Sequence, residues 1–123
     1  MANQVLIIDD DQWTRQALEE ILSRAGFLVQ SLTSGDGLED LLGREEFAIA
    51  LIDYHLPWRN GLEIAQLLKR LQPGCRTVLI SSAYQPERQG DLQAEVIDRF
   101  LAKPFSKSKL LRLLAELQPS SSA

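Results

Sequence analysis

Five residues with reactive or charged side chains follow apolar runs in this chain. Asp9 and Asp10 follow the first run, Asp53 the second, Ser82 the third and Lys103 the fourth. If these runs are neighbouring parallel strands, their polar ends meet at one edge of one sheet, where open α/β sheets bind their ligands. The sequence therefore predicts a cleft that gathers carboxylates, a hydroxyl and an amine.

The carboxylates of this cleft call for a cation or a shared proton. Two carboxylates about 5 Å apart repel by roughly 3 kcal/mol at an effective dielectric constant of about 20. Oxygen ligands of this kind suit Mg²⁺, which binds through one or two carboxylates plus a phosphate. Lys103 adds a charge suited to a phosphoryl oxygen, and Ser82 adds a hydroxyl donor. Together these groups fit phosphoryl transfer, in which a carboxylate can be the nucleophile and form an aspartyl phosphate.

Strands must present these residues at one edge, and the apolar pattern predicts five of them. The runs at 5–8 and 48–52 are apolar on consecutive residues, which is typical of strands covered on both faces of a parallel sheet. Shorter runs at 78–80 and 100–102 follow, and the mixed run at 28–32 suits an edge strand. Helical stretches alternate with these runs, so the order βαβαβαβαβα predicts a three-layer α/β/α fold with right-handed crossovers.

Apolar residues at helical spacing predict the helices between these strands. The expected helices lie at 13–25 before Gly26, at 38–42 before Gly43, at 62–71 before Pro73-Gly74, and at 110–117 with Ser106 as N-cap. Between 83 and 98 the pattern is interrupted by Pro86 and Gly90, so we expect a short or irregular helix there. Arg59-Asn60-Gly61 is predicted to form a turn.

Composition indicates one ordinary globular domain of 123 residues, which we place at 1–118 with a flexible tail or linker at 119–123. The net charge of −4 argues against nucleic-acid binding by this domain. The sequence has no apolar stretch long enough to cross a membrane, and its first residues lack a basic region, so we do not expect a secretory signal. Cys75 is the only cysteine, so an intrachain disulfide is excluded and the cytoplasm is the expected location.

Four short motifs, taken in order, resemble those of one known family. They are Ile8-Asp9-Asp10-Asp11, Leu51-Ile52-Asp53-Tyr54-His55-Leu56-Pro57 with Gly61 following, Ile80-Ser81-Ser82-Ala83, and Phe100-Leu101-Ala102-Lys103-Pro104-Phe105. Over about residues 4 to 117 the chain resembles the receiver domains of bacterial two-component response regulators. The resemblance implies a flavodoxin-like sheet of order 2-1-3-4-5 and a phosphorylated signalling switch rather than a turnover enzyme.

The resemblance assigns the chemistry of the cleft. Asp53 would accept a phosphoryl group from a sensor histidine kinase or a histidine phosphotransfer protein. Asp10, Asp53 and the backbone carbonyl of His55 would bind Mg²⁺, with Mn²⁺ as a substitute, and Asp9 would act mainly through water. Lys103 would hold a phosphoryl oxygen.

The resemblance also implies how the switch is read. Ser82 would bond the phosphoryl group and draw its loop inward, and Phe100 would then change rotamer. The signal would leave through the surface formed by segment 84–98, the strand at 100–102 and the last helix. The resemblance also implies a cis Lys103-Pro104 bond, and X-Pro is the one bond type in which cis costs little. The downstream partner is not identified by the sequence, and a phosphorylation-linked homodimer stays open.

Some residues depart from the family pattern. Phe100 stands where many relatives have tyrosine, which favours output by repacking over output by a new hydrogen bond. His55 and Tyr84 occupy positions that influence loss of the phosphoryl group to water. We expect their bulk to lengthen the phosphorylated lifetime; alternatively His55 acts as a base on that water, or has no kinetic role. Residues 94–98 replace the family's small-residue turn, and we expect high mobility at 85–95.

Each of the two tryptophans allows two interpretations. Trp13 opens the first helix beside the acidic cluster, and we favour packing at the helix start over lining a kinase-docking face. Trp58 lies in the loop after Pro57 and is either exposed or a reporter of the site.

Three alternatives compete with this interpretation. A phosphatase of the haloacid dehalogenase type wants threonine or valine where Trp13 stands, and needs paired acids after the lysine, where only Glu116 remains. A flavodoxin-like electron carrier needs a loop that cradles phosphate after the first strand, and three aspartates there would repel it. A receiver-fold interaction module that works without phosphorylation stays open, although the intact set of cleft residues argues against it.

Overall fold

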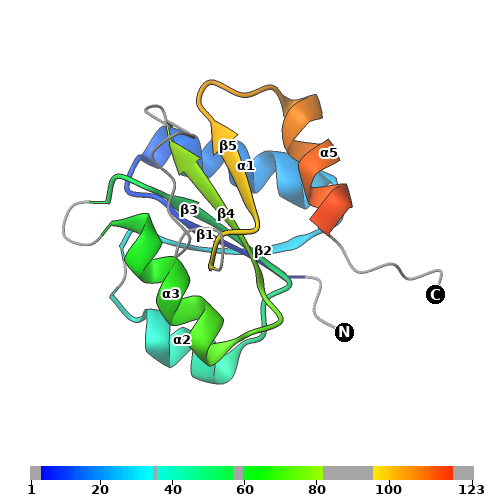
Figure 1. The fold of residues 1–123 in the computed structure, drawn as a ribbon. Helices are drawn as coiled ribbons and strands as arrows, with labels where there is room; N and C mark the ends of the chain where they lie inside the picture. The colour runs from blue at the N-terminus through cyan, green and yellow to red at the C-terminus, as the bar shows by residue number, and fades with distance from the viewer. Residues whose placement is uncertain (1–3, 35, 57–59, 82–95, 118–123) are drawn as a thin grey trace.

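The computed structural model describes residues 4–34, 36–56, 60–81 and 96–117. Figure 1 shows strands and helices alternating along the chain. The elements are β1 (Gln4–Ile8), α1 (Gln12–Arg24), β2 (Leu28–Leu32), α2 (Leu38–Arg44), β3 (Ile49–Asp53), α3 (Gly61–Leu71), β4 (Arg76–Ser81), β5 (Arg99–Ala102) and α5 (Lys107–Leu117). The predictions made for Trp58, Ser82, Tyr84, segment 85–95 and the tail 119–123 fall outside the described residues.

The strands form one parallel sheet in the order β2-β1-β3-β4-β5, which confirms the predicted fold class. The register pairs Ile8 with Ile52 and Asp53 with Ile80, so β1, β3 and β4 finish at the same edge. The mixed strand β2 lies at one side of the sheet, as predicted, and its Leu28 side chain is 64% exposed. This topology brings the carboxyl ends of β1 and β3, with the aspartates found there, side by side.

Alternate residues of the central strands pack against two helical layers. Ile8 and Ile52 belong to a buried cluster shared with α2 and α3, whereas Ile7 and Leu51 belong to one shared with α1 and α5. Figure 1 shows these helix pairs on opposite faces of the sheet. Every residue of β3 is buried, as expected for a strand covered on both faces. Among the described residues, each helix is too short or too polar to span a membrane.

Side-chain caps place the first turns of three helices. The Asp11 carboxylate accepts from the Thr14 N–H, the Asn60 side chain caps α3, and the Ser106 hydroxyl accepts from the Lys109 N–H. The cap at Asn60 corrects the predicted turn, because Gly61 is the first residue of the helix.

The second helix also departs from its expected end. We expected it to stop before Gly43, but α2 continues through this glycine to Arg44. Burial of Leu38, Leu41 and Leu42 against the sheet outweighs the modest helix penalty of one glycine.

Lys69, Thr77 and Asp98 form a polar group at the amino ends of β4 and β5, which we call the amino-edge cluster. Lys69 Nζ donates to Asp98 Oδ2 at 2.8 Å and to the Cys75 carbonyl at 2.8 Å. The Thr77 N–H donates to the same Asp98 oxygen at 2.8 Å, and the Thr77 hydroxyl donates to the Val96 carbonyl. These bonds tie the end of α3 to the starts of the last two strands.

Candidate functional site

The ends of β1 and β3 bring three carboxylates together. Asp9 follows β1 directly, Asp10 comes next, and Asp53 is the last residue of β3, the neighbouring strand. One oxygen atom from each carboxylate lies within 4.8 Å of the others. Asp9 and Asp53 are buried and Asp10 is exposed, so the cluster opens to solvent on one side.

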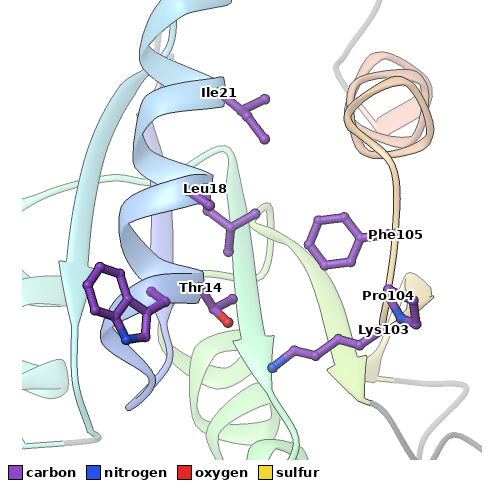
Figure 2. A pocket seen from close by; sticks show the side chains of 8 residues that line it. Thr14, Leu18, Ile21, Lys103, Pro104 and Phe105 are labelled. Atoms are coloured by element: carbon purple, nitrogen blue, oxygen red, sulfur yellow. The ribbon is translucent and has the colours of Figure 1, made fainter.

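Lys103 reaches this cluster from the end of β5. Its Nζ atom lies 3.6 Å from Asp9 Oδ2 and 3.9 Å from Asp53 Oδ2. The Lys103–Pro104 peptide bond is cis, and the Lys103 N–H donates to the Ser81 carbonyl at 3.1 Å. Figure 2 shows the Lys103 side chain extended from its strand toward α1. Among the described residues, the three clustered carboxylates outnumber this lysine, so the site keeps a surplus of negative charge that attracts cations.

The Asp9 carboxylate is only partly satisfied. Its Oδ1 atom accepts from the Asp11 N–H at 2.8 Å, whereas its buried Oδ2 atom has no hydrogen-bond partner among the described residues. Burial raises the pKa of Asp9, and the charge of Asp53 raises it further, against the lowering effects of the Asp11 N–H and of Lys103. A buried oxygen without a donor, beside two further carboxylates, fits the oxygen ligands that Mg²⁺ takes in proteins.

The backbone around Asp53 is held closely on both sides. The His55 N–H donates to Asp53 Oδ1 at 3.2 Å, and the Tyr54 N–H donates to the Ile80 carbonyl at 2.9 Å. At Gly61 an added Cβ would lie 2.6 Å from the Asp53 carbonyl oxygen, so only glycine fits there without a shift. Asp53 thus presents Oδ2 toward Lys103 while its other oxygen is already bonded.

The remaining predicted residues lie around this centre. The exposed His55 ring contacts the Tyr54 ring edge-to-face, with centroids 4.9 Å apart. Phe100 is partly buried and packs against the core cluster of α2 and α3. Ser82 and Tyr84 lie outside the described residues.

Sequence reasoning missed Arg15. Its Nη1 atom donates to the Asp9 carbonyl at 3.0 Å, so α1 holds the loop that carries the acids. A signal for this was present, because a cation near the start of a helix opposes the helix dipole and calls for a local partner. Sequence reasoning also placed Gly61 in a motif, but it did not predict that Gly61 lies so close to the Asp53 carbonyl that glycine is required there.

An apolar groove of about 510 Å³ adjoins the acidic site. It lies between α1 and the chain after β5, and Leu18, Ile21, Phe105 and the Lys103 side chain contribute to its wall (Figure 2). Trp13 stands on the same wall and is 74% exposed. Our expectation that Trp13 packs at the helix start is therefore wrong, because most of its side chain is exposed to solvent.

Comparisons with known proteins agree on one family. Residues 5–115 match the family described as the response regulator receiver domain. The chain is 34% identical over 115 residues to the transcriptional regulatory protein GltR of Pseudomonas aeruginosa, covering 92% of this chain and 48% of GltR. It is 31% identical over 121 residues to the sensory/regulatory protein RpfC of Xanthomonas campestris, covering 95% of this chain and 17% of RpfC. The chain therefore spans about half, or less, of the length of these relatives.

One solved structure shares the fold over most of this chain. It is a response regulator protein from Burkholderia pseudomallei with a phosphorylated aspartic acid, a calcium ion and citrate. The TM-score is 0.80 at 26% identity, and the match covers 93% of this chain and 72% of that one.

Proposed function

Because this chain belongs to the family of response regulator receiver domains, we propose that it is a switch that accepts a phosphoryl group on Asp53. The observation that carries the proposal is the state of the Asp53 carboxylate. It is 7% exposed, its Oδ1 atom is bonded to the His55 N–H, and its Oδ2 atom lies 3.9 Å from Lys103 Nζ. A fixed carboxylate with one oxygen directed at a cation is suited to nucleophilic attack on a phosphoryl group.

The reaction proposed is transfer from a phosphohistidine. An oxygen of Asp53 attacks the phosphorus, the O–P bond forms as the N–P bond breaks, and the imidazole leaves with its electron pair and takes up a proton. Lys103 then stabilises the negative charge that the phosphoryl oxygens bring into the site. The buried position of Asp9 and Asp53 strengthens these interactions, because water screens them less than at the surface.

The same residues would hold the divalent cation. Mg²⁺ or Mn²⁺ bound by Asp10, Asp53 and the His55 backbone carbonyl, with Asp9 acting through water, would offset the charge of the phosphoryl oxygens. Three converging carboxylates and the unpartnered Asp9 oxygen support this assignment. The calcium ion in the Burkholderia pseudomallei structure supports it as well.

The partner proposed is a sensor histidine kinase or a histidine phosphotransfer protein that docks one apolar helix in the groove beside the site. Trp13, Ile21 and Phe105 give that groove an apolar wall, and Lys103 joins it to Asp53. A helix seated there would bring a histidine side chain to the open side of the cluster. Trp13→Ala should slow transfer from such a phosphoprotein and leave phosphorylation by acetyl phosphate unchanged. Equal slowing with both donors would contradict docking in the groove.

The output is proposed to follow from the phosphoryl group itself. Ser82 bonds it, Phe100 repacks, and the surface formed by segment 84–98, β5 and α5 changes its population between two arrangements. His55 and Tyr84 then set how long the phosphoryl group lasts.

The receiver spans residues 1–118 in this proposal. Size-exclusion chromatography of the phosphorylated protein would detect a dimer that forms on phosphorylation.

Intact mass tests the proposed function. With acetyl phosphate and Mg²⁺, the wild type should gain one phosphoryl group and Asp53→Asn should gain none. Asp11→Asn is the matched control, because Asp11 lies next to the cluster and asparagine caps a helix equally well. If the wild type gains nothing, the chain is an interaction module that works without phosphorylation, and equal gain by Asp53→Asn would exclude Asp53 as the acceptor.

A further inference from the structure

Arg15 ties α1 to the loop that carries the acids. This half-buried residue donates from Nη1 to the backbone carbonyl of Asp9 at 3.0 Å. That carbonyl belongs to the peptide unit that joins Asp9 to Asp10, and a peptide unit is rigid and planar. The direction of the Asp9 carbonyl therefore sets the direction in which the chain continues to Asp10.

The other bonds of this loop leave that peptide unit dependent on Arg15. The Asp9 N–H donates to the Leu32 carbonyl at 3.1 Å, which fixes the residue on its strand side. The Asp9 carboxylate accepts from the Asp11 N–H, and Asp11 caps α1. Among the described residues, it is Arg15 that donates a hydrogen bond to the Asp9 carbonyl itself.

The position of Arg15 in α1 also indicates a role in the acidic loop. The helix begins at Gln12, and its first turn has no acidic residue. A cation this close to the amino end of a helix is unfavourable by a few tenths of a kcal/mol, because the helix dipole is positive there. Helix stability therefore does not account for arginine at this position, whereas the acidic loop beside it does.

We propose that Arg15 is a positioning residue for the divalent-cation site, holding the Asp9–Asp10 peptide so that both carboxylates converge on Asp53. The inference rests on the proposed function in one respect, that these carboxylates bind Mg²⁺. Arg15 itself touches neither the ion nor the phosphoryl group in this account.

A magnesium titration separates positioning from simple charge. Removing a positive charge beside three carboxylates would by itself tighten Mg²⁺ binding, whereas releasing the loop weakens it. Arg15→Met keeps an unbranched apolar side chain close to the length of the arginine stem and removes both the charge and the donor. We expect about tenfold weaker Mg²⁺ binding, the usual scale for groups that orient metal ligands. The readout is the midpoint of the tryptophan fluorescence change on adding MgCl₂.

The matched control is Arg24→Met on the same helix. Arg24 pairs with Glu20 at 3.0 Å on the exposed face, far along α1 from the acids. This control should leave the Mg²⁺ midpoint unchanged. Circular dichroism without Mg²⁺ shows whether each variant is folded, and Arg15→Lys, which keeps the charge, should give a smaller weakening if Arg15→Met does not fold.

The outcomes are decisive in both directions. Unchanged or tighter Mg²⁺ binding in Arg15→Met, or equal weakening in Arg24→Met, would overturn the inference. The Mg²⁺ requirement for phosphorylation by acetyl phosphate should shift by the same factor, with the rate restored at saturating Mg²⁺. Failure of the proposed function would instead appear as a wild type that binds Mg²⁺ and gains no phosphoryl group.

Discussion

The two edges of the sheet each bring a lysine to an aspartate, and they do so differently. At the amino edge, Lys69 Nζ lies 2.8 Å from Asp98 Oδ2, and the same oxygen accepts from the Thr77 N–H. At the carboxyl edge, Lys103 Nζ lies 3.6 Å from Asp9 and 3.9 Å from Asp53, both beyond hydrogen-bond distance. One edge is a closed network, and the other leaves charges only partly paired.

The pKa values of Asp98 and Asp9 are shifted in opposite directions, in line with this difference. Burial acts to raise the pKa of Asp98, but hydrogen bonds from Lys69 and Thr77 and the charges of Lys69 and Arg76 outweigh it and lower the pKa. Burial raises the pKa of Asp9, and its hydrogen bond and lysine do not compensate. The comparison indicates that satisfied charges stabilise this fold, whereas the unsatisfied ones are placed for a ligand.

The largest effect is expected from Lys103→Met at the carboxyl edge. Removing the cation that faces Asp53 should slow phosphorylation by acetyl phosphate about 100-fold, the usual effect of losing one preorganised electrostatic group. The free energy of unfolding should change little, since Lys103 Nζ lies beyond hydrogen-bond distance of both Asp9 and Asp53. Single-turnover mass spectrometry gives the rate and urea denaturation the stability. A large loss of stability with an unchanged phosphorylation rate would contradict the comparison, because Lys103 would then stabilise the fold and not serve the reaction.

Lys69→Met should show the converse at the amino edge. It removes the closest cation of Asp98 where both side chains are 20% exposed and leaves the more exposed Arg76 at 3.5 Å, which should lower the free energy of unfolding by about 2 kcal/mol. The phosphorylation rate of the folded protein should stay within about twofold of the wild type. Arg44→Met, which removes an exposed pair with Asp40, is the control and should cost less than about 0.5 kcal/mol. A Lys69 variant as stable as this control would show that the closed network contributes nothing.

The pH dependence of Asp98→Asn is expected to give the smallest effect. Because the folded pKa of Asp98 is below its ordinary value of 3.8, the wild type binds fewer protons at this site folded than unfolded. The stability that the carboxylate contributes is therefore present above about pH 4 and is lost as the pH falls through the lowered folded pKa. Urea denaturation of both proteins between pH 3 and about pH 7 measures this difference. A difference independent of pH would mean that Asp98 acts through packing alone.

Much of the carboxyl edge follows from local sequence. The apolar runs that end at Asp9 and Asp53 predict strands, and parallel pairing brings their carboxylates together without any knowledge of side-chain contacts. The cis bond before Pro104 and the resemblance to the family belong to the same local information. The sheet order and the cluster of acids could therefore be predicted.

The rest depends on contacts between residues far apart in the sequence. Asp98 gives no local signal that Lys69 and Thr77 will satisfy it, since the three are joined only when β5 pairs with β4. Trp13 looked like a packing residue because apolar spacing does not show which side of a helix start is exposed. Arg15 was missed for a related reason: its place near the start of α1 signals that it needs a partner, but does not show that this partner is the backbone carbonyl of Asp9.

The account depends most on Asp53 as the residue that receives the phosphoryl group. Borohydride reduces an acyl phosphate and converts the aspartate that carries it to homoserine, so peptide mass spectrometry can locate it. After treatment with acetyl phosphate and Mg²⁺, homoserine is expected at position 53 and not at Asp9 or Asp10. Homoserine at either neighbour, or at no position in a protein that gained the mass of a phosphoryl group, would contradict the account.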